Sequence, residues 1–138
     1  MEFEGRPDLK MVHVVCLAGT DRSRMIAEEL NRRGYVATYS GILRGRNYTT
    51  EEDLNGVQDI IFTTQRVADG FKKDRRLNKY ATTNNLNKHV IGITESEKEA
   101  AFQHGDIELL NGRIRTGLDS LGFPDIKSKS VGRFRFGR

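Results

Sequence analysis

Three side chains with chemical capacity lie close together in the sequence: Cys16, Arg22 and Ser23. Cys16 is the only cysteine of the chain, and a thiolate at this position would be a strong nucleophile. Arg22 can offer a planar pair of N–H donors to two oxygens of a phosphate-like group. Ser23 can donate a hydrogen bond to the thiolate. This C-x5-R-S spacing therefore predicts attack on phosphorus through a cysteinyl-phosphate intermediate.

The elements around these residues would position them for that chemistry. Residues 11–16 are nearly all apolar and rich in β-branched side chains, which predicts a buried strand that ends at Cys16. An amphipathic helix is predicted from Ser23 to about Arg33, with Gly34 as its C-terminal stop. Ligands of parallel sheets bind where a strand turns into a helix, and the helix dipole there favours an anion and a thiolate. The predicted substrate-binding loop therefore comprises Leu17, Ala18, Gly19, Thr20 and Asp21.

A strand that directly follows this helix makes the start of the chain a βαβ unit, which implies a parallel sheet. The rest of the chain continues the alternation of strands and helices, and Ser96 with Glu99 is a predicted capping box. This order predicts an α/β domain of three layers. Further strands are predicted over 35–40, 58–63 and 88–94, and helices over about 50–55, 65–73 and 96–103.

Two later segments follow the pattern less closely. Residues 74–88 are polar and rich in asparagine, which predicts an irregular connection. The pair Asn111-Gly112 predicts a β-hairpin, with a short helix over 107–110 as the alternative. Residues 121–126 would then form a last strand or its exit loop.

The composition is that of a globular protein, since 36% of the 138 residues are hydrophobic and 30% are charged. We expect a single domain with a flexible lead-in over 1–10 and a basic tail over 127–138. The net charge is +4, and the tail accounts for most of the excess, which makes nucleic acid a candidate partner. No apolar run reaches the roughly 18 residues of a membrane span. Because one cysteine suits a reducing compartment, the expected location is the cytoplasm.

The segment VVCLAGTDRSRMIAEEL resembles the signature of the low-molecular-weight protein tyrosine phosphatases. The segment also resembles the matching signatures of the related RNA polymerase II tail phosphatase and of small predicted bacterial tyrosine phosphatases. Weaker matches to the family follow in the same order along the chain, at residues 39–41, 59–62 and 123–126. The resemblance implies a flavodoxin-like fold, with a central parallel four-stranded sheet and helices on both faces. It also implies that no metal or cofactor takes part, and that the substrate is a phosphorylated protein or a small phosphate ester.

The resemblance also implies roles for single residues at the matching positions. Cys16 would be the nucleophile, Arg22 the phosphate-clamping arginine and Ser23 the residue that stabilises the thiolate. The family uses a late aspartate as general acid, for which Asp125 is the candidate and Asp119 the reserve. This aspartate would protonate the leaving oxygen and then activate water.

Two loop residues depart from the family's pattern. Gly19 stands where the family often has an asparagine that braces the loop. Asp21 stands where many members have a second cysteine, and its carboxylate is expected to weaken phosphate binding and to oppose the thiolate form of Cys16. We expect these departures to affect catalytic efficiency and phosphotyrosine preference more than the fold.

Two other functions are compatible with the same loop. One is a phosphocysteine carrier, which would resemble the sugar phosphotransferase subunits that use a similar loop without an obligatory arginine. The presence of Arg22 argues against it. The other is a phosphate- or nucleic-acid-binding module without turnover, in which Phe134 and Phe136 of the basic tail could stack on bases.

Overall fold

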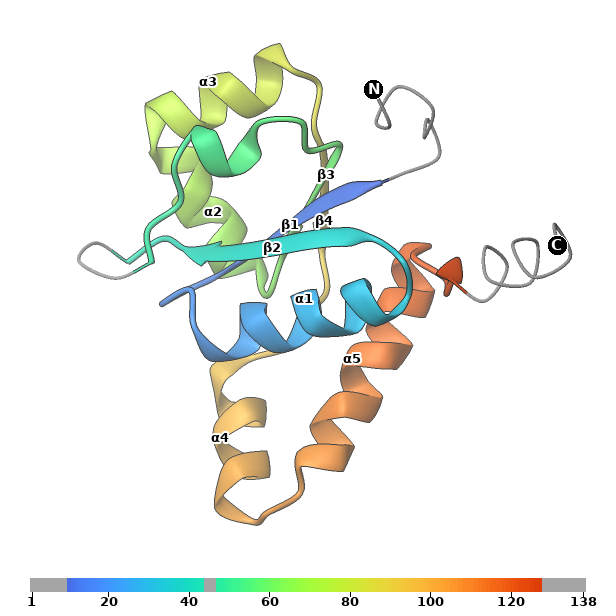
Figure 1. Ribbon diagram of the computed structural model, residues 1–138. Coiled ribbons are helices and arrows are strands. Elements are labelled where there is room, and N and C mark those ends of the chain that lie inside the picture. Colours follow the sequence, from blue (N-terminus) through green and yellow to red (C-terminus); the bar gives the residue numbers. More distant parts are fainter. Residues whose placement is uncertain (1–9, 44–46, 128–138) are drawn as a thin grey trace, which may run out of the picture.

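A central sheet organises the computed structural model, which describes residues 10–43 and 47–127 (Figure 1). All neighbouring strands pair in parallel, in the order β2-β1-β3-β4, so that β1 lies inside the sheet. The register pairs Val14 with Tyr39 on one side and with Ile61 on the other. The carboxyl ends of the strands therefore meet at one edge of the sheet, where β1 ends at Cys16. The strands are β1 (Met11–Cys16), β2 (Val36–Gly41), β3 (Asp59–Phe62) and β4 (Asn87–Val90).

Helices cover both faces of this sheet, which confirms the predicted three-layer, flavodoxin-like α/β fold. One core lies between the sheet and α1 and α5, and a second core lies between the sheet and α2 and α3. Figure 1 shows these two helical layers on opposite sides of the strands. The helices are α1 (Asp21–Arg32), the 3-10 helix η2 (Glu52–Leu54), α2 (Gln65–Lys73), α3 (Arg75–Thr83), α4 (Glu95–Gln103) and α5 (Ile107–Leu121).

Strand β1 is buried on both faces, as its apolar sequence predicts. Val14 packs into the core beneath α1, whereas Val15 packs into the core on the other face. Next to Val14 in the chain lies a buried His13, whose Nδ1 is 2.7 Å from Thr38 Oγ1 and whose Nε2 is 2.6 Å from Ser40 Oγ. Burial lowers the pKa of His13 to about 4. The neutral ring therefore connects β1 to β2 through two side-chain hydrogen bonds.

Helix α1 begins at Asp21, two residues earlier than the predicted start at Ser23. Its C-terminal stop is as predicted, because Gly34 follows the last turn with a φ of +103°. The earlier start places Arg22, together with Ser23, inside the first helical turn, whereas the prediction left Arg22 ahead of the helix.

The prediction of an irregular connection over 74–88 is wrong, because helix α3 occupies most of this segment. Asp74 caps the helix by accepting hydrogen bonds from the backbone N–H groups of Arg76 and Leu77. Leu77 and Ala81, four residues apart, are buried in the core beneath α3. Two buried residues at helical spacing thus anchor a helix whose remaining residues are mostly polar.

The predicted hairpin at Asn111-Gly112 is wrong as well, since both residues lie inside α5. Every fourth residue from Leu110 to Leu118 is buried against the sheet, which is the spacing of a helix face. The alternative of a helix was right in type, although the helix is much longer than the predicted four residues. Residues 122–126 form its exit segment and no strand.

Strand β4 ends at Val90, four residues earlier than predicted, which leaves a loop over 91–94 before α4. This helix has a capping box, but the box consists of Thr94 and Glu97 rather than the predicted Ser96 and Glu99. The difference matters for the site below, because it places Glu95 in the first turn of α4.

The predicted lead-in and the basic tail fall largely on residues 1–9 and 128–138, outside the described part of the chain. Among the helices of residues 10–43 and 47–127, none is long and apolar enough to cross a membrane.

Candidate active site

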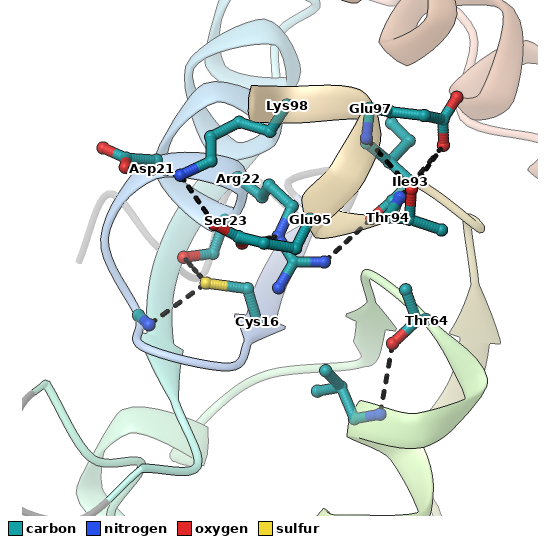
Figure 2. Close-up of polar contacts among 12 residues, drawn as sticks. Cys16, Asp21, Arg22, Ser23, Thr64, Ile93, Thr94, Glu95, Glu97 and Lys98 are labelled. Carbon is teal, nitrogen blue, oxygen red and sulfur yellow. Dashed lines mark hydrogen bonds and ion pairs between the residues drawn. The ribbon is translucent and has the colours of Figure 1, made fainter. Parts of the chain in front are cut away.

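Cys16 lies at the base of the candidate site, at the carboxyl end of β1. The residue is only 2% exposed. Its thiol donates a hydrogen bond to the Ser23 hydroxyl, with Sγ and Oγ 3.1 Å apart, and the backbone N–H of Gly19 donates to Sγ at 3.1 Å (Figure 2). In the thiolate form the same hydroxyl could donate to sulfur instead. The structure thus brings together Cys16 and Ser23 as predicted, with two groups able to stabilise a negative charge on sulfur.

The loop from Leu17 to Thr20 turns back tightly against β2, and this turn requires glycine at position 19. Gly19 has a φ of +72°, which side chains rarely adopt. A Cβ atom at this position would lie 2.4 Å from the backbone nitrogen of Gly41. The close approach of the two backbones explains why position 19 is glycine.

Asn47 braces this loop from the segment that follows β2. Its Nδ2 donates to the carbonyl oxygen of Gly19 at 3.0 Å and to that of Tyr39 at 3.1 Å. The backbone of Gly41 donates to the carbonyl oxygen of Asn47. The Cys16 loop has no asparagine of its own, and Asn47 from a neighbouring loop holds it instead. This role of Asn47 was not predicted from the sequence.

Arg22 is buried in the first turn of α1, with 5% of its side chain exposed. Its Nη1 donates to the carbonyl oxygen of Ile93 at 3.0 Å, which ties the guanidinium to the loop after β4. Its Nε lies 3.2 Å from Glu95 Oε1. A guanidinium has five N–H donors, so these two contacts leave others for an oxyanion. Arg22 thus has the predicted place in the site, but it already contacts a carboxylate there.

Lys98 links the first turn of α4 to the first turn of α1. Its Nζ lies 2.8 Å from Glu95 Oε2 and 3.3 Å from Asp21 Oδ2. The hydrogen bond from Lys98 to Glu95 is the largest influence on the lysine and raises the pKa of Lys98. Figure 2 shows Lys98 reaching from α4 toward Asp21 and the loop. The ammonium group partly compensates the Asp21 carboxylate, whose charge was expected to oppose an anion.

The structure does not bring Asp125 or Asp119 to this site. Asp119 pairs with Arg33 Nη1 at 2.7 Å, and the backbone N–H groups of Ile126 and Lys127 donate to the carbonyl oxygen of Arg33. Arg33 is the C-cap of α1, whereas Cys16 lies beyond the N-terminal end of that helix. A helix of 12 residues is roughly 18 Å long. This placement contradicts the predicted role of Asp125, or of Asp119, as general acid.

Glu95 and Lys98 were also not predicted from the sequence, in which they lie far from Cys16. One signal could have pointed to them, because the loops that follow parallel strands meet at the same edge of the sheet. Within residues 10–43 and 47–127, no group of three or more His, Cys, Asp or Glu side chains is arranged to hold a metal ion.

The chain matches no protein-family model, and comparisons with curated proteins and with solved structures found no match either. The inference of function therefore rests on the residues of the site.

Proposed function

We propose that the protein is a cysteine-dependent phosphomonoesterase, a protein-tyrosine-phosphatase-like hydrolase that acts through a cysteinyl-phosphate intermediate. The observation that supports it best is the environment of Cys16. Its sulfur accepts a backbone N–H, contacts a serine hydroxyl, and lies where β1 passes into α1. The substrate would be a phosphorylated protein or a small phosphate ester. A reducing, cytoplasmic location, which the single cysteine favours, would keep the thiol available.

The residues of the loop and of the first turn of α1 would have separate roles in phosphoryl transfer. The Cys16 thiolate attacks phosphorus and displaces the alcohol or phenol, and water then attacks the cysteinyl phosphate and restores the thiolate. Backbone N–H groups of the loop and of the first turn of α1 would bind the phosphoryl oxygens, since a helix N-terminus favours an anion. Arg22 would add its remaining donors, and Ser23 would stabilise the sulfur as it leaves.

The test is hydrolysis of para-nitrophenyl phosphate by the wild-type protein, by Cys16→Ser and by Arg22→Lys. We expect Cys16→Ser to lower the rate on the order of a thousandfold or more, because the covalent route needs the thiolate. Arg22→Lys keeps the charge but loses the planar fork, and a loss of about a hundredfold is expected. The exposed Arg66 on α2 supplies the control Arg66→Lys, which should leave the rate unchanged. Equal rates for the wild-type protein and Cys16→Ser would refute the proposal.

One observation favours a second function, a phosphate-binding module without turnover. The Glu95 carboxylate already contacts Arg22 and could compete with a phosphate for it. Such a module would bind inorganic phosphate and protect Cys16 from alkylation by iodoacetamide, yet it would release no nitrophenol from the ester. The two functions are thus separated by measuring binding and turnover on the same preparation.

A further inference from the structure

The proposed reaction needs a proton donor for the leaving oxygen, and this inference rests on that proposed function. The two aspartates expected to supply the proton lie at the opposite end of α1. At the site itself, two carboxylates are held in place, those of Asp21 and Glu95. Of these, Glu95 contacts the phosphate-clamping Arg22 directly.

Glu95 is fixed to Arg22 through the backbone as well as through its carboxylate. Arg22 Nη1 holds the carbonyl oxygen of Ile93, only two residues before Glu95. The side chain of Thr94, which lies between them, accepts a hydrogen bond from the backbone of Glu97 and so fixes the start of α4. Lys98 holds the second carboxylate oxygen of Glu95 at 2.8 Å. Three contacts, made by Ile93, Thr94 and Lys98, therefore define the position of the Glu95 carboxyl group relative to the guanidinium.

Glu95 also lies on the side of the site where a proton donor for the leaving oxygen is needed. In-line displacement places the leaving oxygen on the side of phosphorus opposite the attacking sulfur. Cys16 is 2% exposed and lies at the base, so the leaving oxygen must face the open side. The Glu95 side chain is 48% exposed, so its carboxyl group can approach the leaving oxygen from the solvent side of Arg22. Asp21 instead turns toward Lys98 and Arg24.

We infer that Glu95 is the general acid of the proposed reaction and, in its second half, the general base. The sulfur–phosphorus bond forms as the bond from phosphorus to the leaving oxygen breaks, and that oxygen takes the proton of the Glu95 carboxyl group. Water then attacks phosphorus, its proton passes to the Glu95 carboxylate, and the sulfur–phosphorus bond breaks to restore the thiolate.

The experiment compares two esters that differ in how much their leaving group needs a proton. Nitrophenolate is a stable anion and leaves without help, whereas phenolate, whose conjugate acid has a tyrosine-like pKa of about 10, does not. We expect Glu95→Gln to lower kcat/KM for phenyl phosphate by about a hundredfold and for para-nitrophenyl phosphate much less.

Two matched variants serve as controls. Glu99→Gln makes the same change one turn further along α4, at an exposed residue, and Asp125→Asn removes the aspartate at the far end of α1. Both should behave like the wild-type protein with both esters. Thermal unfolding of each variant shows that the folded protein is being compared.

Each of the other outcomes overturns the inference. Equal losses for both esters in Glu95→Gln would show that Glu95 only positions Arg22. Faster turnover of both esters, with tighter binding of inorganic phosphate, would make Glu95 a blocking anion. A selective loss for phenyl phosphate in Asp125→Asn would return the role to that residue. If the wild-type protein turns over neither ester faster than Cys16→Ser, the proposed function itself fails, and Glu95 has no reaction to assist.

Discussion

At the scale of single residues, the loop over Cys16 depends on backbone geometry more than on charge. Gly19 donates its N–H to the sulfur while its carbonyl oxygen accepts from Asn47. Both contacts fix the orientation of the peptide groups that would face a phosphate. A larger residue at position 19 would have to displace the backbone of Gly41. The loop is therefore specified by close contact between two backbones.

Replacing Gly19 by alanine tests this claim, and Gly105→Ala is its control. Both glycines have a positive φ, +72° and +66°, but a Cβ atom at Gly19 would clash with backbone atoms, whereas one at Gly105 would meet nothing within 4 Å. Gly105→Ala should lower the free energy of unfolding by about 1 kcal/mol through strain. Gly19→Ala should cost about 1–3 kcal/mol more and slow the alkylation of Cys16. Equal free energies of unfolding in urea for the two variants would contradict this explanation.

At the scale of elements, the predictable ones are those with a clear apolar periodicity. Helix α2 and strand β1 have the predicted bounds, because Val67 and Phe71 mark one helix face and β1 is almost wholly apolar. Helix α3 was missed because its two buried residues lie in a polar segment. Helix α5 was predicted only as a short alternative over 107–110, because Asn111-Gly112, a hairpin signal in isolation, lies in a helix whose apolar face packs on the sheet.

A pH-sensitive contact of the sheet lies between β1 and β2. Its buried His13 has a pKa lowered to about 4 from 6.5. Between these values the unfolded chain binds a proton that the folded chain does not, so the free energy of unfolding falls as the pH falls from about 6.5 to about 4. Full passage through this window costs about 3 kcal/mol.

Urea unfolding at pH 7 and at pH 5 measures this effect. The wild-type protein should lose about 2 kcal/mol between the two values through His13. The free energy of unfolding of His13→Asn should lack this loss of about 2 kcal/mol. His104→Asn, at an exposed histidine, should behave like the wild-type protein. The same pH dependence in all three proteins would exclude His13 as its source.

At the scale of the whole molecule, the two ends of α1 have different tasks. Its N-terminal end lies beside Cys16 and carries Arg22, while its C-terminal end is tied to α5 through Arg33. The Arg33 side chain contacts Glu29 at 2.9 Å and Asp119 at 2.7 Å and donates to the carbonyl oxygen of Phe123. Two of its partners thus belong to α5 and the segment after it, so this end of the molecule holds two helices together.

Arg33→Met should therefore lower stability without changing the chemistry. Removing one partner of a buried ion pair costs about 3–5 kcal/mol, and Arg33 is only 7% exposed. The neighbouring Arg32, which also pairs with Glu29 but is 60% exposed, supplies the control Arg32→Met, with an expected cost below about 1 kcal/mol. Turnover per folded molecule should be unchanged in both variants. A loss of turnover in folded Arg33→Met would show that the two ends are coupled.

The site residues that were predicted correctly are close together in the sequence. Cys16, Arg22 and Ser23 share one loop and one helical turn, so their spacing sufficed to place them together. Glu95 and Asn47 reach the loop from other elements, and the sequence contains no spacing that relates them to Cys16. Asp125 was assigned because residues 123–126 resemble the family's late Pro-Asp segment, but the chain after α5 lies at the C-terminal end of α1, at the opposite edge of the sheet.

The central claim is that the phosphoryl group of the substrate is transferred to the sulfur of Cys16 before water releases it as phosphate. It is tested most directly by mixing the protein with para-nitrophenyl phosphate, denaturing it rapidly and locating the phosphoryl group by mass spectrometry. We expect one phosphoryl group on Cys16 in the wild-type protein and none in Cys16→Ser. Turnover without phosphorylation of Cys16, or no turnover and no phosphorylation, would contradict the claim.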